Sequence, residues 1–286
     1  MKKYGFGADV GGTTIKMGLF EMDGTLVEKW EIPTDTTEKG AHILQDIAAT
    51  VHGKMVENDL TKDMVEGIGI GVPGAVDKDG VVNRAVNLGW DIVPLAEELG
   101  KLSGMKVKVG NDANVAALGE NWMGSGKGYN SIVMVTLGTG IGGGIIIDGN
   151  ILTGANGAAG EIGHIVVNEQ EIEACNCGHY GCIEQYASAT GIVRMAKRAL
   201  AGTSEDSKLR TFGEAVSAKD VFDCARAGDK VACDVVDQVC GMLGATLAKI
   251  GCVVNPDAFI IGGGVSRAGQ ILIDALQEPF KAQVFH

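Results

Sequence analysis

The sequence predicts an α/β protein of two related domains. Its length of 286 residues is enough for about two domains. The chain has 45% hydrophobic and 21% charged residues, as ordinary globular proteins do. Runs typical of strands alternate with helical patterns along most of the chain, which favours a sheet covered by helices. One strand–turn–strand pattern occurs twice, at residues 7–24 and 132–149, so we expect an internal duplication.

The first half of the chain carries patterns of four strands and three helices. Apolar residues recur at helical spacing over 43–55, whereas the run rich in Val and Ile at 65–72 ends at a Pro-Gly pair. We therefore expect strands at 7–10, 15–20, 65–72 and 107–109, and helices at 43–55, 94–103 and 113–122.

The second half repeats the strand–turn–strand unit and then becomes mainly helical. Strands are expected at 132–137, 141–147 and 258–261, and helices at 190–201, 218–227 and 229–251, with a last helix beginning near 269. The segment Gly124-Ser125-Gly126 lies between the halves. It predicts two α/β domains, residues 1–124 and residues 125–286.

The charge of the chain argues against nucleic acids and membranes as partners. Its 24 Lys and Arg against 36 Asp and Glu give a net charge of −12, which repels phosphate backbones and anionic lipids. No leader-like apolar stretch follows Met1, and the apolar run 131–147 holds five glycines and fits two strands better than a membrane span. Seven cysteines in such a chain indicate a reducing compartment, so we expect a cytoplasmic protein.

Two Gly/Thr turns are candidate phosphate-binding sites. Gly11-Gly12-Thr13-Thr14 and Gly138-Thr139-Gly140 each lie between two predicted strands, where glycines let backbone N–H groups point into one concavity. Asp9, beside the first turn, would repel a polyphosphate unless a cation such as Mg²⁺ intervened. Neither turn has the Gly-Lys-Ser/Thr ending of a P-loop, and neither begins a helix as a dinucleotide-binding turn does. The alternative is a pair of ordinary tight hairpins, although 44 glycines, about twice the average usage, favour a special role.

Asn111 and Asp112 follow a predicted strand and precede a predicted helix. A side chain at that position projects from the carboxyl edge of a sheet, where a carboxylate can take a proton from an attacking hydroxyl in phosphoryl transfer. The alternative is that one of these residues only caps the helix. Asp112 is thus a candidate general base.

Three cysteines and one histidine form a candidate metal site. Cys175, Cys177 and Cys182 lie within eight residues, and His164 lies eleven residues before the first of them. Three thiolates and one imidazole are typical of a closed, tetrahedral, structural Zn²⁺ site. The alternative is a set of unrelated buried thiols, as we expect for the other four cysteines, which fall in helical patterns.

Taken together, the motifs resemble those of one known family. Asp9-Val10-Gly11-Gly12-Thr13-Thr14-Ile15-Lys16, the second Gly/Thr turn, Asn111-Asp112-Ala113-Asn114 and the segment 160–184 are similar to motifs of the ROK family of bacterial sugar kinases and regulators. The similarity runs from residue 5 to about residue 275. It implies an actin-like (ribonuclease H-like) two-domain sugar kinase fold, with an interdomain cleft that holds ATP and Mg²⁺.

The resemblance also implies a role for each candidate residue. Asp112 would be the catalytic base on the primary hydroxyl of the sugar, and structural Zn²⁺ would be bound by His164 and the three cysteines. The implied sugar-binding residues are Gly74, Asn87, Asn111, Asp112, Glu161, His164 and Glu184. The implied ATP-binding residues are Asp9, Gly11, Gly12, Thr13, Thr14, Lys16, Gly138, Thr139, Gly140, Gly262 and Gly263. Without the resemblance, the two glutamates would be interpreted as surface acids, and the glycines after residue 261 as an ordinary turn.

The implied function is that of a glucokinase, which forms glucose 6-phosphate from glucose and ATP. The alternative within this class is a kinase for an N-acetylhexosamine, either N-acetylglucosamine or N-acetylmannosamine. It stays open because the predicted hydroxyl-binding residues do not identify the substituent at carbon 2 of the sugar. A sugar-sensing ROK protein is the alternative outside it, although the first phosphate turn begins at residue 11 and leaves no room for an N-terminal DNA-binding module. The family further implies a homodimer, and a strand and helix after residue 286, so we expect a chain truncated at its C-terminus.

Overall fold

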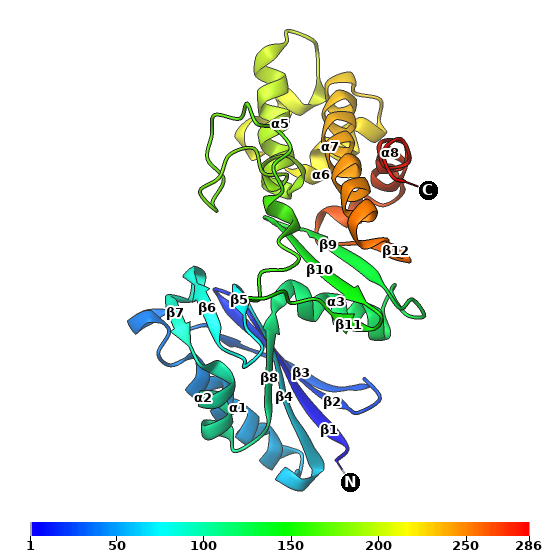
Figure 1. The fold of residues 1–286 in the computed structure, drawn as a ribbon. Helices are drawn as coiled ribbons and strands as arrows, with labels where there is room; N and C mark the ends of the chain where they lie inside the picture. Colours follow the sequence, from blue (N-terminus) through cyan, green and yellow to red (C-terminus); the bar gives the residue numbers. More distant parts are fainter. Residues whose placement is uncertain (1, 286) are drawn as a thin grey trace. The chain divides into compact units, whose positions relative to one another are not determined.

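The computed structural model describes residues 2–285, and the chain divides into two compact units (Figure 1). Residues 1–127 with 151–159 form unit 1, and residues 128–150 with 160–286 form unit 2. Unit 1 thus extends past the expected boundary at residue 124 and gains the segment 151–159. A Cβ on Gly157 would lie 2.3 Å from the carbonyl oxygen of Val76, so this segment packs directly on the backbone of unit 1.

The sheet of unit 1 has the strand order β3-β2-β1-β4-β8. Strands β1, β4 and β8 are parallel, whereas β2 runs antiparallel to β1 and to β3. In β1, the side chains of Phe6, Ala8 and Val10 are buried at every second position, as expected for a strand with one face on a core. The strands are β1 (Tyr4–Val10), β2 (Thr14–Glu21), β3 (Leu26–Pro33), β4 (Val65–Val72) and β8 (Val107–Asn111).

Three helices and a small antiparallel sheet complete unit 1. The helices, all expected from the sequence, are α1 (Ile43–Glu57), α2 (Leu95–Ser103) and α3 (Asp112–Met123). The sequence did not predict β3 or the small sheet, which consists of β5 (Ala75–Val76), β6 (Val82–Ala85) and β7 (Trp90–Val93). The short 3-10 helices of the chain are η1 (Thr37–Lys39), η2 (Lys62–Met64), η3 (Val86–Leu88), η4 (Ile162–His164), η5 (Lys208–Ala215) and η6 (Val265–Ala268).

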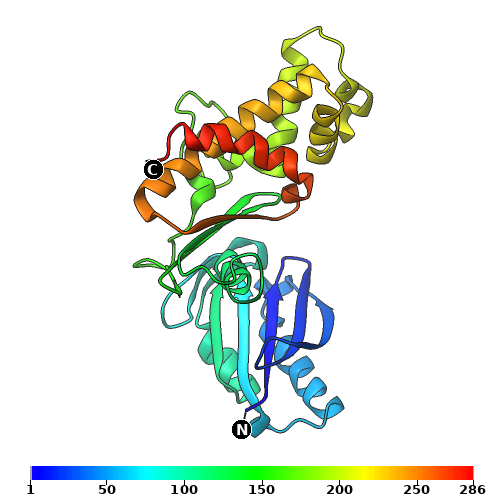
Figure 2. The same cartoon turned by 90° about the vertical axis from the view of Figure 1, so that its right-hand side faces the viewer.

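Unit 2 combines a sheet of order β11-β10-β9-β12 with a group of helices, of which α7 and α8 lie side by side (Figure 2). Its strands are β9 (Ile132–Leu137), β10 (Ile141–Ile147), β11 (Asn150–Ile151) and β12 (Ala258–Gly262). Its helices are α4 (Glu184–Ala187), α5 (Ala189–Gly202), α6 (Ala218–Arg226), α7 (Lys230–Val254) and α8 (Gln270–Lys281).

The two sheets confirm the internal duplication expected from the sequence. β1 and β2 form an antiparallel hairpin with β4 parallel to β1, and β9 and β10 form an antiparallel hairpin with β12 parallel to β9. Each Gly/Thr turn joins the two strands of its hairpin. The turns therefore occupy equivalent positions in two equivalent arrangements of strands.

Helix α7 is the one helix within residues 2–285 that is long and apolar enough to cross a membrane. However, 61% of its most apolar stretch is buried inside the protein. Val235, Val239 and Leu243 on this helix belong to the hydrophobic core of unit 2. Such burial is typical of the core helix of a globular domain.

Candidate active site

Three parallel strands bring the predicted residues of unit 1 to one edge of its sheet. Asp9 lies near the end of β1, Gly74 follows β4, and Asn111 ends β8. The register pairs Asp9 with Gly71 and Val72 with Asn111, so these ends are level with one another. Ligands in α/β folds bind beyond the carboxyl ends of the strands, which makes this edge the candidate active site.

Asn111 is held in place by hydrogen bonds to the backbone. Its Oδ1 accepts from the N–H groups of Ala113 at 3.0 Å and Asn114 at 3.2 Å, which makes Asn111 the N-cap of α3. Its Nδ2 donates to the carbonyl oxygen of Gly74 at 3.1 Å. The helix-cap alternative is therefore correct for Asn111, but one Nδ2 hydrogen is left for a ligand.

The carboxyl group of Asp112 is reached by solvent but partly enclosed by protein. Its Oδ1 accepts a hydrogen bond from the N–H of Ala113 at 2.8 Å, which lowers its pKa. Desolvation outweighs this bond and raises the pKa above the ordinary value of 3.8, and the charge of Asp9 adds to the rise. A carboxylate with a raised pKa is a better proton acceptor, as a general base requires.

The first Gly/Thr turn presents unpaired backbone donors. The N–H of Gly11 donates to the carbonyl oxygen of Thr14 at 3.1 Å and closes the turn. Within residues 2–285, the N–H groups of Gly12 and Thr13 at its tip make no hydrogen bond. These donors are available to an anion.

Three other predicted residues lie beside this turn. Lys16 is opposite Asp9 across the β1–β2 hairpin, so both side chains are on the same face of the sheet. The backbone of Asn87 passes the turn, because a Cβ on Gly12 would lie 3.5 Å from its carbonyl oxygen. The structure therefore brings Asp9, Lys16 and Asn87 together around the first turn.

The second Gly/Thr turn has the same plan as the first. The N–H of Gly138 donates to the carbonyl oxygen of Gly140 at 2.9 Å and closes the turn. In the part of the chain that the structure describes, the N–H groups of Thr139 and Gly140 are without a partner. In both turns, a backbone hydrogen bond closes the turn, and two N–H groups at its tip stay free to bind an anion.

The predicted adenosine residues lie at the base of the second turn. Gly262 ends β12 and pairs with Thr136 of β9. Gly263 has a φ of 83°, and a Cβ there would lie 2.5 Å from the carbonyl oxygen of Leu137. Only glycine fits at position 263, because the backbone of Leu137 occupies the space that a side chain would need.

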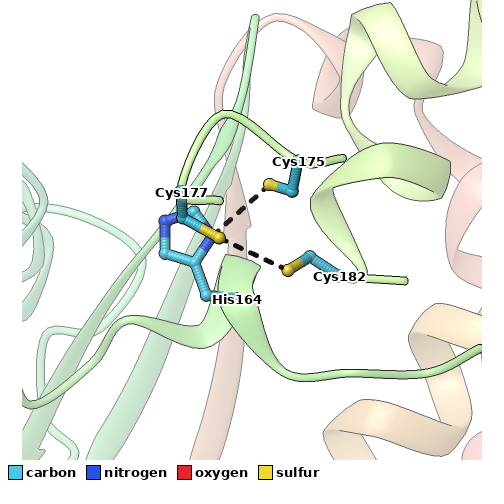
Figure 3. Close-up of side chains that lie close together, drawn as sticks. All are labelled: His164, Cys175, Cys177 and Cys182. Carbon is cyan, nitrogen blue, oxygen red and sulfur yellow. Dashed lines mark hydrogen bonds between the residues drawn. The ribbon is translucent and has the colours of Figure 1, made fainter. Parts of the chain in front are cut away.

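His164, Cys175, Cys177 and Cys182 come together in unit 2 (Figure 3). Their ligand atoms all lie within 4.8 Å of one another. Nδ1 of His164 is 3.8 Å from Sγ of Cys175, and the Sγ atoms of Cys177 and Cys182 are 3.6 Å apart. At Zn²⁺ bond lengths, neighbouring tetrahedral ligands are separated by about 3.5–3.8 Å, so donor set and spacing fit this ion. Burial raises the pKa of the Cys182 thiol to about 12, so this sulfur needs a cation to become a thiolate at neutral pH.

Glu184 connects the cysteine cluster with the second Gly/Thr turn. Its Oε2 accepts a hydrogen bond from the N–H of Ile141 at 2.9 Å, and its Oε1 lies 3.7 Å from Sγ of Cys175. His164 directs Nδ1 to the sulfurs, while its Nε2 lies 3.9 Å from Oε2 of Glu161. The predicted sugar-binding residues Glu161, His164 and Glu184 therefore form one group with the candidate metal site.

The sequence predicts no role for four residues of this region. The hydroxyl groups of Thr34 and Thr190 donate to carbonyl oxygens of the two turns. Gln185 accepts a hydrogen bond from the N–H of Cys182 at 3.1 Å and so holds the cysteine loop, which we define as residues 165–183 between η4 and α4. Oδ1 of Asn114 is buried with no partner among the described residues. Only Asn114 lies in a recognisable motif, whereas the other three have no signal in the local sequence.

The profile of the ROK family matches residues 5–286. The chain belongs to the ROK family. It is 44% identical over 279 residues to a glucokinase of Halalkalibacterium halodurans, covering 96% of this chain and 84% of that protein. A glucokinase of Thermotoga maritima is 41% identical over 276 residues, 95% of this chain and 85% of that protein. The structure of a ROK glucokinase from Streptomyces griseus in complex with glucose and AMPPNP has a TM-score of 0.77 and 36% identity, covering 99% of this chain and 90% of that one.

Membership of the ROK family confirms the resemblance found in the sequence. The similarity to the solved glucokinase also confirms the actin-like α/β fold. The roles of individual residues stay predictions, since these comparisons concern whole chains.

The cysteine loop of this ROK protein is also held by a buried carboxylate. The side chain of Glu171 is 2% exposed and accepts hydrogen bonds from Arg194 at 2.8 Å, from Arg198 at 2.8 and 3.0 Å, and from Tyr186 at 2.6 Å. The bonds from Arg198 are the main reason that its pKa lies well below the usual 4.5. Both arginines lie on α5, so Glu171 ties the loop to this helix.

Replacing Glu171 with Gln should lower the free energy of unfolding by about 2 kcal/mol, because Arg194 and Arg198 lose their hydrogen bonds to a buried carboxylate and keep only Glu173 as an anionic partner. Urea titration of both proteins measures this difference. Because the pKa of Glu171 is lowered by folding, its contribution is complete above about pH 4.5 and declines as the pH falls below that value. The difference between the two proteins should shrink accordingly in acid.

The matched control is Glu214→Gln, which removes a surface carboxylate paired with Lys197. This variant should keep the urea midpoint of the wild type. A Glu171→Gln protein with the same midpoint would show that Glu171 does not hold the loop.

Proposed function

We propose that this protein is an ATP-dependent glucokinase, which transfers the γ-phosphoryl group of ATP to the 6-hydroxyl of glucose. The observation that carries the proposal is the 44% identity to a glucokinase over 96% of the chain. A ROK structure of the same fold contains glucose and AMPPNP, an ATP analogue. Phosphoryl transfer asks a protein mainly for alignment, charge stabilisation and a proton acceptor, and this chain offers residues for each.

In the proposed reaction, the 6-oxygen of glucose attacks the γ-phosphorus, the bond to the β–γ bridging oxygen breaks, and ADP leaves. The proton of the 6-hydroxyl passes to the carboxylate of Asp112. The remaining Nδ2 hydrogen of Asn111 binds a neighbouring sugar hydroxyl. Its bonds to Gly74 and to the start of α3 support this role, because they fix the orientation of the amide.

We infer that the free N–H groups of both Gly/Thr turns bind phosphate oxygens of ATP. Asp9 would hold the Mg²⁺ that accompanies ATP, and this ion, when bound, offsets phosphate charge. Lys16 adds a positive charge beside it, and the flat backbone at Gly262 and Gly263 would contact the adenosine. The proposed ATP-binding residues are therefore those expected from the sequence.

The cluster of His164, Cys175, Cys177 and Cys182 would hold a structural Zn²⁺. Its role would be to fix the His164 ring, so that the Nε2–H is presented to a sugar hydroxyl. Glu161 and Glu184, with the weaker candidates Gly74 and Asn87, would complete the sugar site. A site that forms hydrogen bonds with several sugar hydroxyls binds sugars that lack one of them much more weakly, because its own polar groups are then left without partners.

A cytoplasmic location and a homodimeric state complete the proposal. The seven cysteines, three of them clustered with His164, support a reducing compartment, where thiols serve as metal ligands more often than they form disulfides. The dimer follows from the family resemblance.

The proposed function is tested by a coupled ADP-release assay with glucose, mannose, fructose, N-acetylglucosamine and N-acetylmannosamine. Glucose should give the highest kcat/KM, by about tenfold or more, since differences of that size follow from one or two sugar contacts. A higher kcat/KM with an N-acetylhexosamine than with glucose would show that the protein is the alternative N-acetylhexosamine kinase. The absence of turnover with all five sugars would contradict the proposed kinase function.

Replacing Asp112 with Asn should leave the affinity for AMPPNP unchanged and lower kcat about 10²- to 10⁴-fold, which is the usual effect of a positioned base. The base acts as a carboxylate, so activity of the wild type should fall as the pH drops through its pKa. Because that pKa is raised, the acidic limb of kcat/KM should lie above pH 3.8. The control is Asp91→Asn, an exposed carboxylate on β7, which should keep both kcat and the pH profile. Near-normal kcat in Asp112→Asn would remove Asp112 from the mechanism.

Elemental analysis of the purified protein should find about one zinc per chain, because the four ligands form one closed site. Replacing Cys182 with Ser should abolish this zinc while circular dichroism checks that the chain is folded. Cys252→Ser, which changes an exposed thiol outside the cluster, should keep the metal. Folded wild-type protein without zinc would contradict the proposal.

A further inference from the structure

The carbonyl oxygens of the first Gly/Thr turn are held from outside the turn. Thr34, the residue after β3, donates its hydroxyl to the carbonyl oxygen of Gly11 at 2.7 Å. It also donates its backbone N–H to the carbonyl oxygen of Thr13 at 3.0 Å. One residue therefore fixes the carbonyls on both sides of the tip.

The second Gly/Thr turn is held in the same manner by the start of α5. The hydroxyl of Thr190 donates to the carbonyl oxygen of Thr139 at 2.8 Å, and the N–H of Ala189 donates to that of Gly138 at 2.8 Å. The first N–H groups of a helix have no partner inside it, so the turn also satisfies a helix donor. Again, one threonine hydroxyl and one backbone N–H hold two carbonyl oxygens of the turn.

These bonds decide which way the free N–H groups point. The C=O and N–H groups of a trans peptide point in opposite directions. The carbonyl of Gly11 shares its peptide with the N–H of Gly12, and the carbonyl of Thr139 shares its peptide with the N–H of Gly140. Holding each oxygen against a threonine therefore directs the N–H away from it, to the side where no group of residues 2–285 accepts it.

Glycine makes this restraint necessary. Glycine adopts a wide range of backbone angles at low cost, so a peptide beside it rotates easily. A peptide that rotated in either turn would present a carbonyl oxygen, and not an N–H, to an anion. The oxygen would repel a phosphate group, so the turns need a partner for their carbonyls.

The two threonines are not products of the internal duplication. Thr34 follows a strand, whereas Thr190 lies in the first turn of a helix. Two different elements thus provide the same hydroxyl-to-carbonyl bond to two equivalent turns. This arrangement indicates a requirement of the turns themselves.

We propose that Thr34 and Thr190 are positioning residues, which fix the backbone N–H groups of Gly12 and Gly140 in the two Gly/Thr turns for binding the phosphate oxygens of ATP. The inference rests on the proposed function, since it takes ATP as the ligand of both turns. Neither threonine is proposed to touch the nucleotide.

The test uses Thr34→Val and Thr190→Val, which keep the shape of the side chain and remove the hydroxyl. Each should raise the Kd for Mg²⁺–AMPPNP, measured by calorimetry, and the KM for ATP by about three- to tenfold, as expected for one lost hydrogen bond. The KM for glucose should change by less than about twofold. Thr34→Ser and Thr190→Ser keep the hydroxyl and should restore nucleotide binding to within about twofold of the wild type.

Two control variants separate positioning from general stability. Thr211→Val removes a hydroxyl that donates to the carbonyl oxygen of Lys208 at 2.7 Å, the same kind of bond in another part of unit 2. Thr36→Val removes an exposed hydroxyl two residues after Thr34. Both should bind AMPPNP as the wild type does, and the melting temperature of every variant shows whether it is folded.

The outcomes distinguish this inference from the proposed function. Wild-type nucleotide affinity in folded Thr34→Val and Thr190→Val would overturn the inference alone. Equal losses in the valine and serine variants would also overturn it. A wild type that binds AMPPNP but phosphorylates no hexose would overturn the proposed function and leave the binding test of the threonines decisive, whereas a wild type that binds no nucleotide would overturn both.

Discussion

The parallel pairing of β1 with β4 and β8, and of β9 with β12, decides where the candidate site residues lie. Parallel strands end at the same edge of a sheet, so Asp9 and Asp112 are brought to one edge although about a hundred residues separate them. In each sheet, the Gly/Thr turn of the hairpin follows the carboxyl end of the first strand, β1 or β9. The N–H of Ile141, just after the second Gly/Thr turn, donates a hydrogen bond to Glu184, which follows the cysteine loop.

The parts of the site that form short motifs could be predicted from the sequence. The Gly/Thr turns, Asn111-Asp112 and the four candidate metal ligands follow from residue type and spacing, and the structure brings those ligands within 4.8 Å of one another. The segment 151–159 could not be predicted, because its place depends on a contact between Gly157 and Val76, far apart in the sequence. Thr34 has no local pattern either, since its bonds to Gly11 and Thr13 form only once β3 lies beside β2.

Asn111 shows that a local and a functional explanation of one residue need not exclude each other. In the sequence, a helix cap and a functional contact are alternative explanations of the Asn111-Asp112 pair. In the structure the Asn111 side chain is the cap, through bonds from Ala113 and Asn114, and it also holds the carbonyl of Gly74. A side chain fixed so firmly is well suited to present its remaining hydrogen in one direction.

The cysteine loop is ordered by bonds within the protein. Gln185 bonds the backbone at Cys182, and Glu171 ties the same loop to two arginines of α5. The side chains of the candidate metal site are therefore held close together by contacts of the loop with the rest of unit 2. The proposed Zn²⁺ would therefore bind to a loop whose shape the protein itself already fixes.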